Sequence, residues 1–168
     1  MTITRFSLVF LIAYGSLAMA QPVAPAPNGI EFPTGYSHWQ SIALSHRTDK
    51  DSIRAILGND IAVKAARTGA TKPWPEGTIL AKVSWQQRND ENWPEAVVPG
   101  QFTQMEIMLK NAKKYTETGG WGFARWRGKE LKPWGDNADF TKECMACHIS
   151  VSGQDYVFTK PATWADPN

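Results

Sequence analysis

The stretch Cys144-Met145-Ala146-Cys147-His148 decides the fold, because the domain has to be built around whatever these side chains bind. The spacing Cys-x-x-Cys-His is the attachment pattern of c-type haem. Two cysteines on one helical turn can present their sulfurs to the two vinyl groups along one porphyrin edge. The histidine that follows is then placed to bind the iron. The motif therefore predicts one covalently bound haem c, attached at Cys144 and Cys147 and ligated on its proximal side by His148.

Other uses of paired cysteines fit this sequence less well. The chain has only 2 cysteines, and both lie in this short stretch, so they cannot cross-link distant segments as cysteines of secreted proteins usually do. A thioredoxin-like redox pair is expected at a helix N-terminus early in the chain, whereas this pair is close to the C-terminus. A structural zinc site needs four ligands, and only His38 and His46 remain to assist the motif.

Residues 1–20 have the layout of a secretory signal peptide. Arg5 precedes an apolar run, Phe6 to Leu17, which ends in the small-residue pattern Ala18-Met19-Ala20. This layout predicts cleavage before Gln21 and a periplasmic protein. A membrane anchor is the alternative, but the run is short for a bilayer and lacks a basic flank at its far end. We therefore expect no membrane span after cleavage, in a compartment where c-type haem is attached.

The mature chain is expected to form one domain. Residues 21–29 are Pro-rich and are predicted to be a disordered lead, and residues 30–168 are long enough for one sizeable core, the haem c domain. Loss of Arg5 lowers the formal charge from +2 to +1. Lysines and arginines are scattered among acidic residues with no basic block, which excludes a nucleic-acid partner. The 8 tryptophans suit a large core or a flat prosthetic group.

Hydrophobic spacing predicts a sheet with a few helices. Alternation predicts strands at residues 78–85, 102–109 and 119–127. Helical spacing runs over 51–68 with an interruption at Gly58-Asn59, and the polar, Pro-bearing stretch 89–100 is expected to be a loop. Asp139 is expected to cap a short helix over 140–148. The fold class is therefore α+β, a mainly antiparallel β-sheet domain with a few helices, one of which carries the C-terminal haem attachment motif.

The position of the motif bears on the second axial ligand of the iron. Only 20 residues follow His148, with no Met or His among them. A sixth ligand would have to come from upstream: His38, His46, Met105, Met108 or a lysine. The two methionines would face opposite sides of a strand as core residues, and the two histidines lie in polar surroundings typical of a surface. We therefore expect an iron that is open on one side and able to bind a small molecule.

Three stretches of the sequence, one of which contains the haem motif, carry a resemblance to a known family. They are Glu143–Thr159 (ECMACHISVSGQDYVFT), Gly77–Val83 (GTILAKV) and Tyr36–Trp39 (YSHW). With the haem motif, they resemble the cytochrome P-460 family and its relatives, the β-type cytochromes c′, over roughly residues 32–164. The resemblance implies a secreted haem c protein of mainly antiparallel β structure, usually dimeric, with an open iron. Cytochromes P-460 oxidise hydroxylamine to nitrous oxide or nitrogen oxides, whereas the β-type cytochromes c′ bind nitric oxide or carbon monoxide.

The resemblance also implies roles for individual residues. Lys82 matches the lysine that is joined to a porphyrin meso carbon in cytochromes P-460, although a lysine pointing to water from a half-exposed strand would look the same. A distal carboxylate that moves protons is expected, and Asp139 and Glu143 are candidates because they precede the haem motif, although each could be a helix cap or a solvated charge. The pocket walls or the plain core would be built by aromatic residues such as Phe102, Trp121, Phe123 and Trp126.

Two functions remain open from the sequence. The first is a haem oxidoreductase that acts on hydroxylamine, with Lys82 tuning the porphyrin, and with electrons passed to an external redox partner such as a small periplasmic cytochrome. The second is a non-catalytic protein that binds nitric oxide or carbon monoxide. A plain electron carrier would need an upstream sixth ligand. In either of the first two cases we expect a homodimer with a small-molecule ligand.

Overall fold

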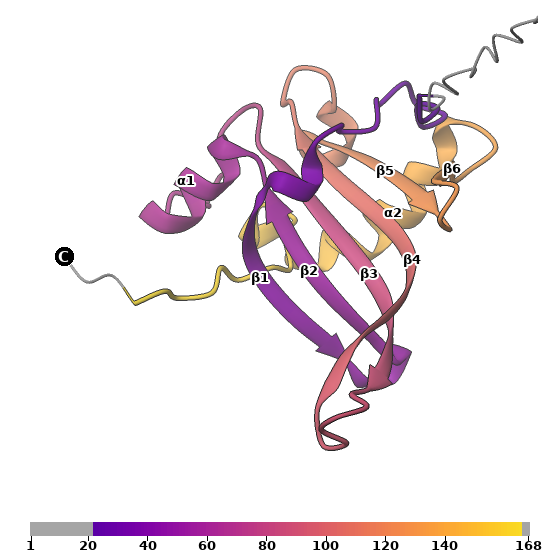
Figure 1. The fold of residues 1–168 in the computed structure, drawn as a ribbon. Helices are drawn as coiled ribbons and strands as arrows, with labels where there is room; N and C mark the ends of the chain where they lie inside the picture. Colours follow the sequence, from indigo (N-terminus) through magenta and orange to yellow (C-terminus); the bar gives the residue numbers. More distant parts are fainter. Residues whose placement is uncertain (1–21, 166–168) are drawn as a thin grey trace, which may run out of the picture.

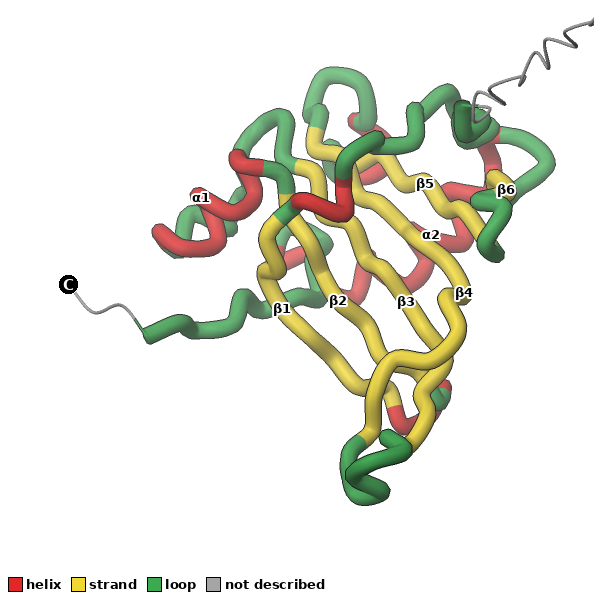
Figure 2. The backbone as a smooth tube through the Cα atoms, viewed as in Figure 1, coloured by secondary structure: helices red, strands yellow, loops and turns green. Residues whose placement is uncertain are grey.

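The computed structural model describes residues 22–165, so the predicted signal peptide at 1–20 lies outside the described residues. Six strands form one sheet in chain order, each antiparallel to the next (Figures 1 and 2). The strands are β1 (Gln40–Arg47), β2 (Ser52–Gly58), β3 (Ile79–Asn89), β4 (Val97–Lys110), β5 (Trp121–Arg127) and β6 (Lys132–Pro133). This meander confirms the predicted antiparallel fold.

Two α-helices accompany the sheet, α1 (Asp60–Thr68) and α2 (Thr141–His148). Short 3-10 segments connect the larger elements: η1 (Tyr36–His38), η2 (Thr48–Lys50), η3 (Thr116–Thr118), η4 (Ala138–Phe140) and η5 (Ile149–Gln154). The cysteines lie on α2, as the sequence predicted. None of the helices among residues 22–165 has the length and apolar character needed to cross a bilayer.

The helix predicted over 51–68 is wrong in its first half. Residues Ser52–Gly58 form β2, paired on one side with β1 and on the other with β3. The helix begins only after Asn59, whose side-chain oxygen accepts a hydrogen bond from the Ala62 backbone N–H. That cap starts α1 at Asp60 and separates it from the strand, because a capping residue itself has extended backbone geometry.

Two smaller expectations also need correction. The loop predicted over 89–100 is shorter, because β3 continues to Asn89 and β4 begins at Val97. The turn between them is held by Asp90, whose carboxylate accepts hydrogen bonds from the backbone of Asn92 and Trp93. At the last helix, Asp139 is not the cap: it lies inside η4, and its own N–H donates to the side chain of Asn137.

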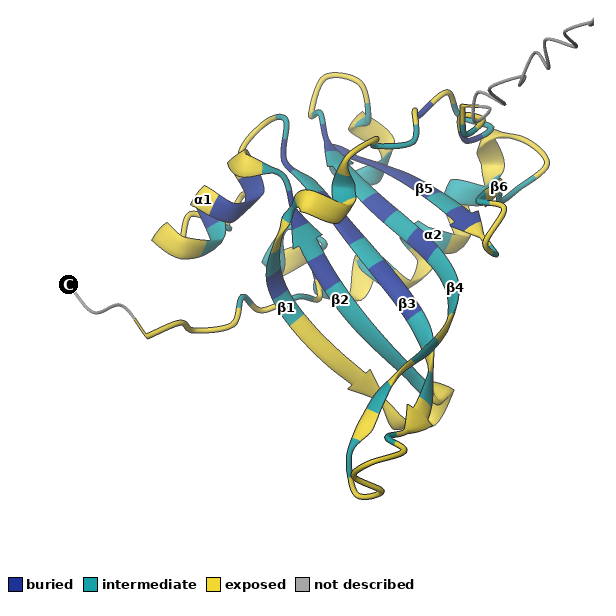
Figure 3. Ribbon diagram, in the orientation of Figure 1, coloured by how far each residue is buried: buried dark blue, intermediate teal, exposed yellow. Residues whose placement is uncertain are grey.

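Buried and half-buried residues alternate along the second half of β4 (Figure 3), and because successive side chains of a strand point to opposite faces, the two faces of the sheet differ in chemistry. One face, which we call the apolar face, carries the buried residues Val83, Met105 and Trp126. The other, which we call the charged face, carries Lys82, Glu106 and Arg125, paired in register across β3, β4 and β5. Helix α2 lies behind the sheet in the view of Figure 1, and η1 lies in front.

Residues 22–39 cover the apolar face, so residues 22–29 of the predicted Pro-rich lead pack against the sheet, while Gln21 lies outside the described residues. The indole Nε1 of Trp126 donates to the carbonyl of Ala24 over 2.9 Å, and the Asn28 amide donates to the Phe123 carbonyl over 2.8 Å. Ala26 and Ile30 are 3% and 4% exposed and belong to the core cluster on this side. Proline-rich composition therefore did not prevent ordering, because the large indole on β5 offered the segment both an apolar surface and a donor.

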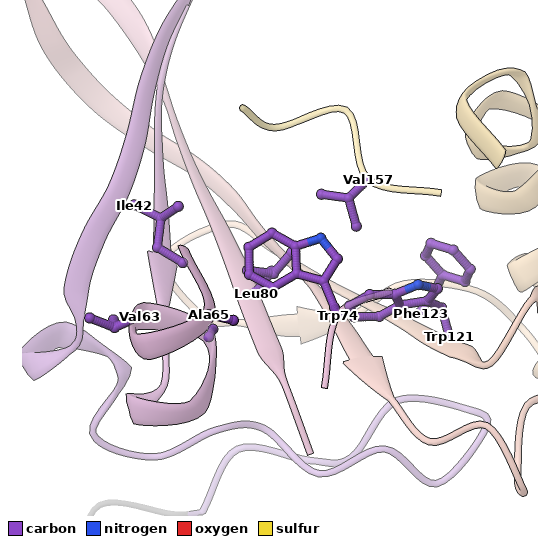
Figure 4. Packing of buried hydrophobic residues seen from close by; sticks show 9 residues of the cluster. Ile42, Val63, Ala65, Trp74, Leu80, Trp121, Phe123 and Val157 are labelled. Carbon is purple, nitrogen blue, oxygen red and sulfur yellow. The ribbon is translucent and has the colours of Figure 1, made fainter. Parts of the chain in front are cut away.

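A second core cluster lies at the end of the charged face that is closest to α1. Trp74, Leu80, Trp121 and Phe123 form its centre, and Val157 from the C-terminal segment packs there too (Figure 4). The partly buried Cys144, Met145 and Tyr156 pack against it. The haem motif is thus attached to the sheet through this cluster.

Candidate haem-binding site

Helix α2 presents the two cysteines with different degrees of burial. Cys144 is half-buried and Cys147 is exposed, and both are free thiols. Burial raises the pKa of the Cys144 thiol to about 11, although the charges of Arg125 and Lys82 act in the opposite direction. An unattached Cys144 is therefore a neutral thiol at neutral pH.

His148 is the last residue of α2, and a hydrogen bond fixes the orientation of its ring. Its Nδ1 lies 2.6 Å from the backbone carbonyl oxygen of Tyr156, which can only accept a hydrogen bond, so Nδ1 carries the proton. The ring centroids of Phe123 and Phe158 each lie 5.1 Å from that of His148. Burial lowers the pKa of His148, opposed by the Tyr156 carbonyl. A neutral ring protonated on Nδ1 leaves the Nε2 lone pair available to a metal.

These residues fit a covalently bound haem. Two free thiols on one helix and a neutral imidazole one residue further along are the donors that c-type haem requires. Aromatic rings beside the imidazole supply the apolar surroundings that a porphyrin needs. Zinc finds no equivalent: within residues 22–165, no three His, Cys, Asp or Glu side chains come together as a metal-binding group.

Lys82 lies in the middle of β3 on the charged face, and its side chain is 31% exposed. Its Nζ is 2.6 Å from Oε2 of Glu106, the residue opposite it on β4. Lys82 shares its face of β3 with Leu80, which belongs to the same cluster as Phe123, the residue whose ring lies against His148. The lysine is thus paired, as a largely buried ammonium group is expected to be.

Glu106 is the centre of a network of charges. Oε1 of Glu106 accepts a hydrogen bond from Nε of Arg125 over 3.0 Å and lies 2.9 Å from Nη2 of the same guanidinium. Its other oxygen forms the ion pair with Lys82 and accepts a hydrogen bond from the amide of Gln104. Burial opposes ionisation and is the largest influence on Glu106, but the two cations outweigh it and hold the pKa of Glu106 below its usual 4.5. The carboxylate is 18% exposed and ionised.

Two polar groups next to this network have no partner among the described residues. Arg54 on β2 and Ser84 on β3 are opposite each other in register, two positions along from Lys82. The Nε of Arg54 and the Oγ of Ser84 are both buried and make no hydrogen bond within residues 22–165. The register Arg54–Ser84–Gln104 lies next to the register of Lys82 and Glu106 on the charged face. Both atoms are inaccessible to solvent.

The two carboxylates predicted as proton relays occupy different positions. Glu143 on α2 is 60% exposed and lies 3.1 Å from Nη1 of Arg125, so it joins the outer edge of the network. Asp139 is 72% exposed and pairs with Lys142 over 2.9 Å. Neither is next to Lys82. The structure brings Glu106 there instead, a residue that sequence reasoning missed because its role depends on the register of β3 against β4.

The upstream residues considered as sixth ligands are divided by the sheet. Met105 is fully buried in the cluster on the apolar face. His46 hydrogen-bonds Gln87, and His38 ends η1, whose neighbours Tyr36 and Trp39 pack on the apolar side. Met108 alone of these four packs against the cluster that holds Cys144. The predicted aromatic wall is divided in the same way, with Phe102 and Trp126 on the apolar face and Trp121 and Phe123 in the other cluster.

Comparison with known proteins identifies the family to which the chain belongs. A family model described as Cytochrome P460 matches residues 33–159, which span all six strands and the Cys-x-x-Cys-His motif. No curated protein matches the chain.

Proposed function

The chain belongs to the cytochrome P460 family of haem c proteins, and from this we propose that it is a haem oxidoreductase that oxidises hydroxylamine to nitrous oxide or nitrogen oxides. The observation that carries the proposal is the carboxylate of Glu106, which is 18% exposed and is held by Lys82 and Arg125 on the charged face. A site that only bound a neutral gas would need no such acid. An oxidation that releases protons from its substrate needs an acceptor for them.

The haem motif supplies the attachment and the axial ligand. Cys144 and Cys147 would form the two thioether bonds, and Nε2 of His148 would bind the iron, because Nδ1 is already engaged by Tyr156. The bound haem supplies the redox chemistry by taking electrons from the substrate. The placement of Met105, and of the neighbours of His38, in the cluster on the apolar face supports an iron that is open opposite His148.

Lys82 would be joined through Nζ to a porphyrin meso carbon. Forming that bond removes one hydrogen from the amine and one from the carbon, and therefore needs a two-electron oxidant such as a peroxide. Glu106, 2.6 Å from Nζ, is placed to take the proton that the ammonium group must lose before it can react. The bond would also remove one of the two cations that hold the pKa of Glu106 low. Its carboxylate would then accept protons more readily.

In turnover, Glu106 would accept protons released from hydroxylamine as its electrons leave. Arg125 would keep Glu106 in place, because it holds the carboxylate at two nitrogens. Glu143 would act only through Arg125, which it bonds at the exposed edge.

We also propose a periplasmic, homodimeric protein that passes its electrons to an external partner such as a small cytochrome. The Arg5-led apolar run and the haem motif support secretion, since c-type haem is attached outside the cytoplasm. The family resemblance supports the dimer.

The first experiment is an optical spectrum of the reduced protein, matured in a periplasm, together with its intact mass under denaturing conditions. A strongly red-shifted Soret band and a mass two hydrogens below polypeptide plus haem would support the Lys82 bond. Lys82→Met should restore an ordinary c-type band and the simple mass. Lys142→Met, a change to an exposed lysine on α2, is the matched control and should leave both unchanged. A simple mass in the wild-type protein would contradict the bond.

The second experiment measures hydroxylamine-dependent reduction of an artificial electron acceptor. Glu106→Gln should lower kcat by about 10² or more, the usual contribution of a positioned acid-base group. Glu91→Gln is the matched control, since Glu91 also pairs with an arginine but is 87% exposed. Wild-type protein that binds nitric oxide tightly but reduces no acceptor would replace the enzyme with the gas-binding function. An unchanged kcat in Glu106→Gln would remove Glu106 from the mechanism.

A further inference from the structure

The orientation of the His148 ring depends on a single backbone carbonyl. Tyr156 O lies 2.6 Å from Nδ1 and is eight residues further along the chain. An acceptor on the far nitrogen of a metal-binding histidine fixes the tautomer, sets the ring angle and raises the basicity of the other nitrogen. The contacts that fix the backbone of residues 155 and 156 therefore affect the orientation and basicity of the His148 ring.

The backbone that presents this carbonyl is in an unfavourable conformation. Asp155 and Tyr156 have φ angles of 50° and 62°, in the left-handed region that non-glycine residues seldom occupy. Two such residues in succession cost on the order of 1 kcal/mol or more each, and persist only where surrounding contacts hold them. The local hydrogen bonds from Asp155 N to Ser152 O and from Tyr156 N to Val151 O are ordinary turn contacts.

The contacts that hold this turn converge on Asp155. Nζ of Lys110 lies 2.7 and 2.9 Å from the two carboxylate oxygens, and the side chains of the pair are only 7% and 11% exposed. The Trp74 backbone N–H donates to the same carboxylate over 2.8 Å. The indole N–H of Trp121 donates to the Asp155 carbonyl over 2.8 Å. The end of β4, the turn before β3 and the start of β5 thus all hold one residue.

The ring of Tyr156 packs directly against Gly119, where no side chain could be accommodated. A Cβ added at Gly119 would come within 2.1 Å of the Tyr156 ring, and Gly119 itself has a φ of 65°. Its carbonyl accepts a 3.3 Å hydrogen bond from Lys110 Nζ. The same lysine lies over the Trp121 ring, 4.9 Å from its centroid. Lys110 therefore links the site where the Tyr156 ring packs to the carboxylate that holds its backbone.

We propose that the buried Lys110–Asp155 ion pair is a positioning element for His148. It holds residues 155 and 156 in the conformation in which the Tyr156 carbonyl accepts the Nδ1 proton, and through that bond it strengthens His148 as a ligand and lowers the reduction potential of the iron. The inference rests on the ligand role proposed for His148 and on bound haem, and it is independent of hydroxylamine chemistry.

Two variants test the pair in the haem-loaded protein. Asp155→Asn keeps the shape of the side chain and an acceptor for the Trp74 N–H but removes the charge. Lys110→Met combined with Asp155→Asn removes both charges, so that no unpaired ion is left in a buried position. Met105→Ala is the matched control, because it destabilises the core on the opposite face and has no contact with the turn. Thermal unfolding establishes that each variant is folded at the temperature of measurement.

The readouts are the iron–histidine stretching band of the ferrous protein by resonance Raman and the reduction potential. Weakening the Nδ1 hydrogen bond should move the band to lower frequency and make the potential more positive in both pair variants, with neither change in Met105→Ala. An unchanged band and potential in the folded pair variants would overturn the inference, and so would equal shifts in Met105→Ala. A band that survives His148→Ala would instead disprove the ligand role of His148.

Discussion

The two faces of the sheet are made by the same strands, yet they serve different purposes. On β4, Met105 is fully buried against residues 22–39 and their neighbours, while the adjacent Glu106 bonds two cations on the other side. The apolar face is completed by the chain's own N-terminal segment. The charged face holds the network of Lys82, Glu106 and Arg125 beside the haem motif.

This difference shows how strand alternation separates stability from chemistry. A change on the apolar face removes packed volume but leaves the ions in place. A change on the charged face leaves an ion unpaired or a donor free, which alters the site more than the core. The predictions below test this division, from the largest expected effect to the smallest.

Replacing both cysteines of the motif should abolish thioether attachment of haem. In Cys144→Ser combined with Cys147→Ser, made in a Lys82→Met background so that the proposed lysine bond is also absent, haem staining after denaturing electrophoresis should be lost completely. The sheet has its own cluster on the apolar face and should still form, as measured by far-ultraviolet circular dichroism. Haem that remains attached after denaturation would show that the motif is not the attachment site.

Met105→Ala should destabilise the protein without altering the site. Removing a fully buried methionine costs about 2–5 kcal/mol, measured as the free energy of unfolding in urea. The optical spectrum should stay unchanged. Met108→Leu, a volume-conserving change on the other face, should cost less than about 1.5 kcal/mol. If Met108→Leu converts a low-spin ferric spectrum to high-spin, Met108 is a sixth ligand and the open site is wrong.

The charged face should add a pH dependence that the apolar face lacks. Folding lowers the pKa of Glu106 below 4.5, so its ionised form stabilises the protein. This contribution is complete above pH 4.5 and is lost as the pH falls through the lowered value, by about 1.4 kcal/mol for each unit of lowering. Lowering the pH from 7 to 3 should therefore reduce the free energy of unfolding, measured in urea, more in the wild-type protein than in Glu106→Gln. Parallel curves would show that Glu106 is not paired in the folded protein.

Asp139→Asn should have the smallest effect. Its carboxylate is 72% exposed and pairs only with the exposed Lys142, and such pairs contribute little to stability. Neither the unfolding midpoint nor the turnover of hydroxylamine should change measurably. A large loss of turnover would restore Asp139 as a proton relay and weaken the case for Glu106.

The sequence predicted those features that depend on local pattern. Alternation located β3, β4 and β5, and the spacing of Cys144, Cys147 and His148 located the haem motif on its helix. It did not locate β2, because Ala55 and Ile56 suit the face of a helix as well as a strand between two others.

The residues missed at the site depend on contacts between distant segments. Glu106 meets Lys82 only because β4 pairs with β3 in one register, and a shift of a single residue would bring it to the other face. Asp155 meets Lys110 across 45 positions of sequence. Hydrophobic periodicity does not predict contacts between segments that are distant in sequence, and a single sequence offers no other signal for them.

The meander order of the strands also has a consequence for the sequence of folding events. Each strand pairs with its neighbour in the chain, although the connection between β2 and β3 carries α1, and pairing between strands that are neighbours in sequence favours rapid folding. The haem motif and the turn at Asp155 come after the last strand. Both pack on residues of β3 and β5, so their contacts need strands that are made earlier in the chain, which suits a cofactor that is attached after the polypeptide is made.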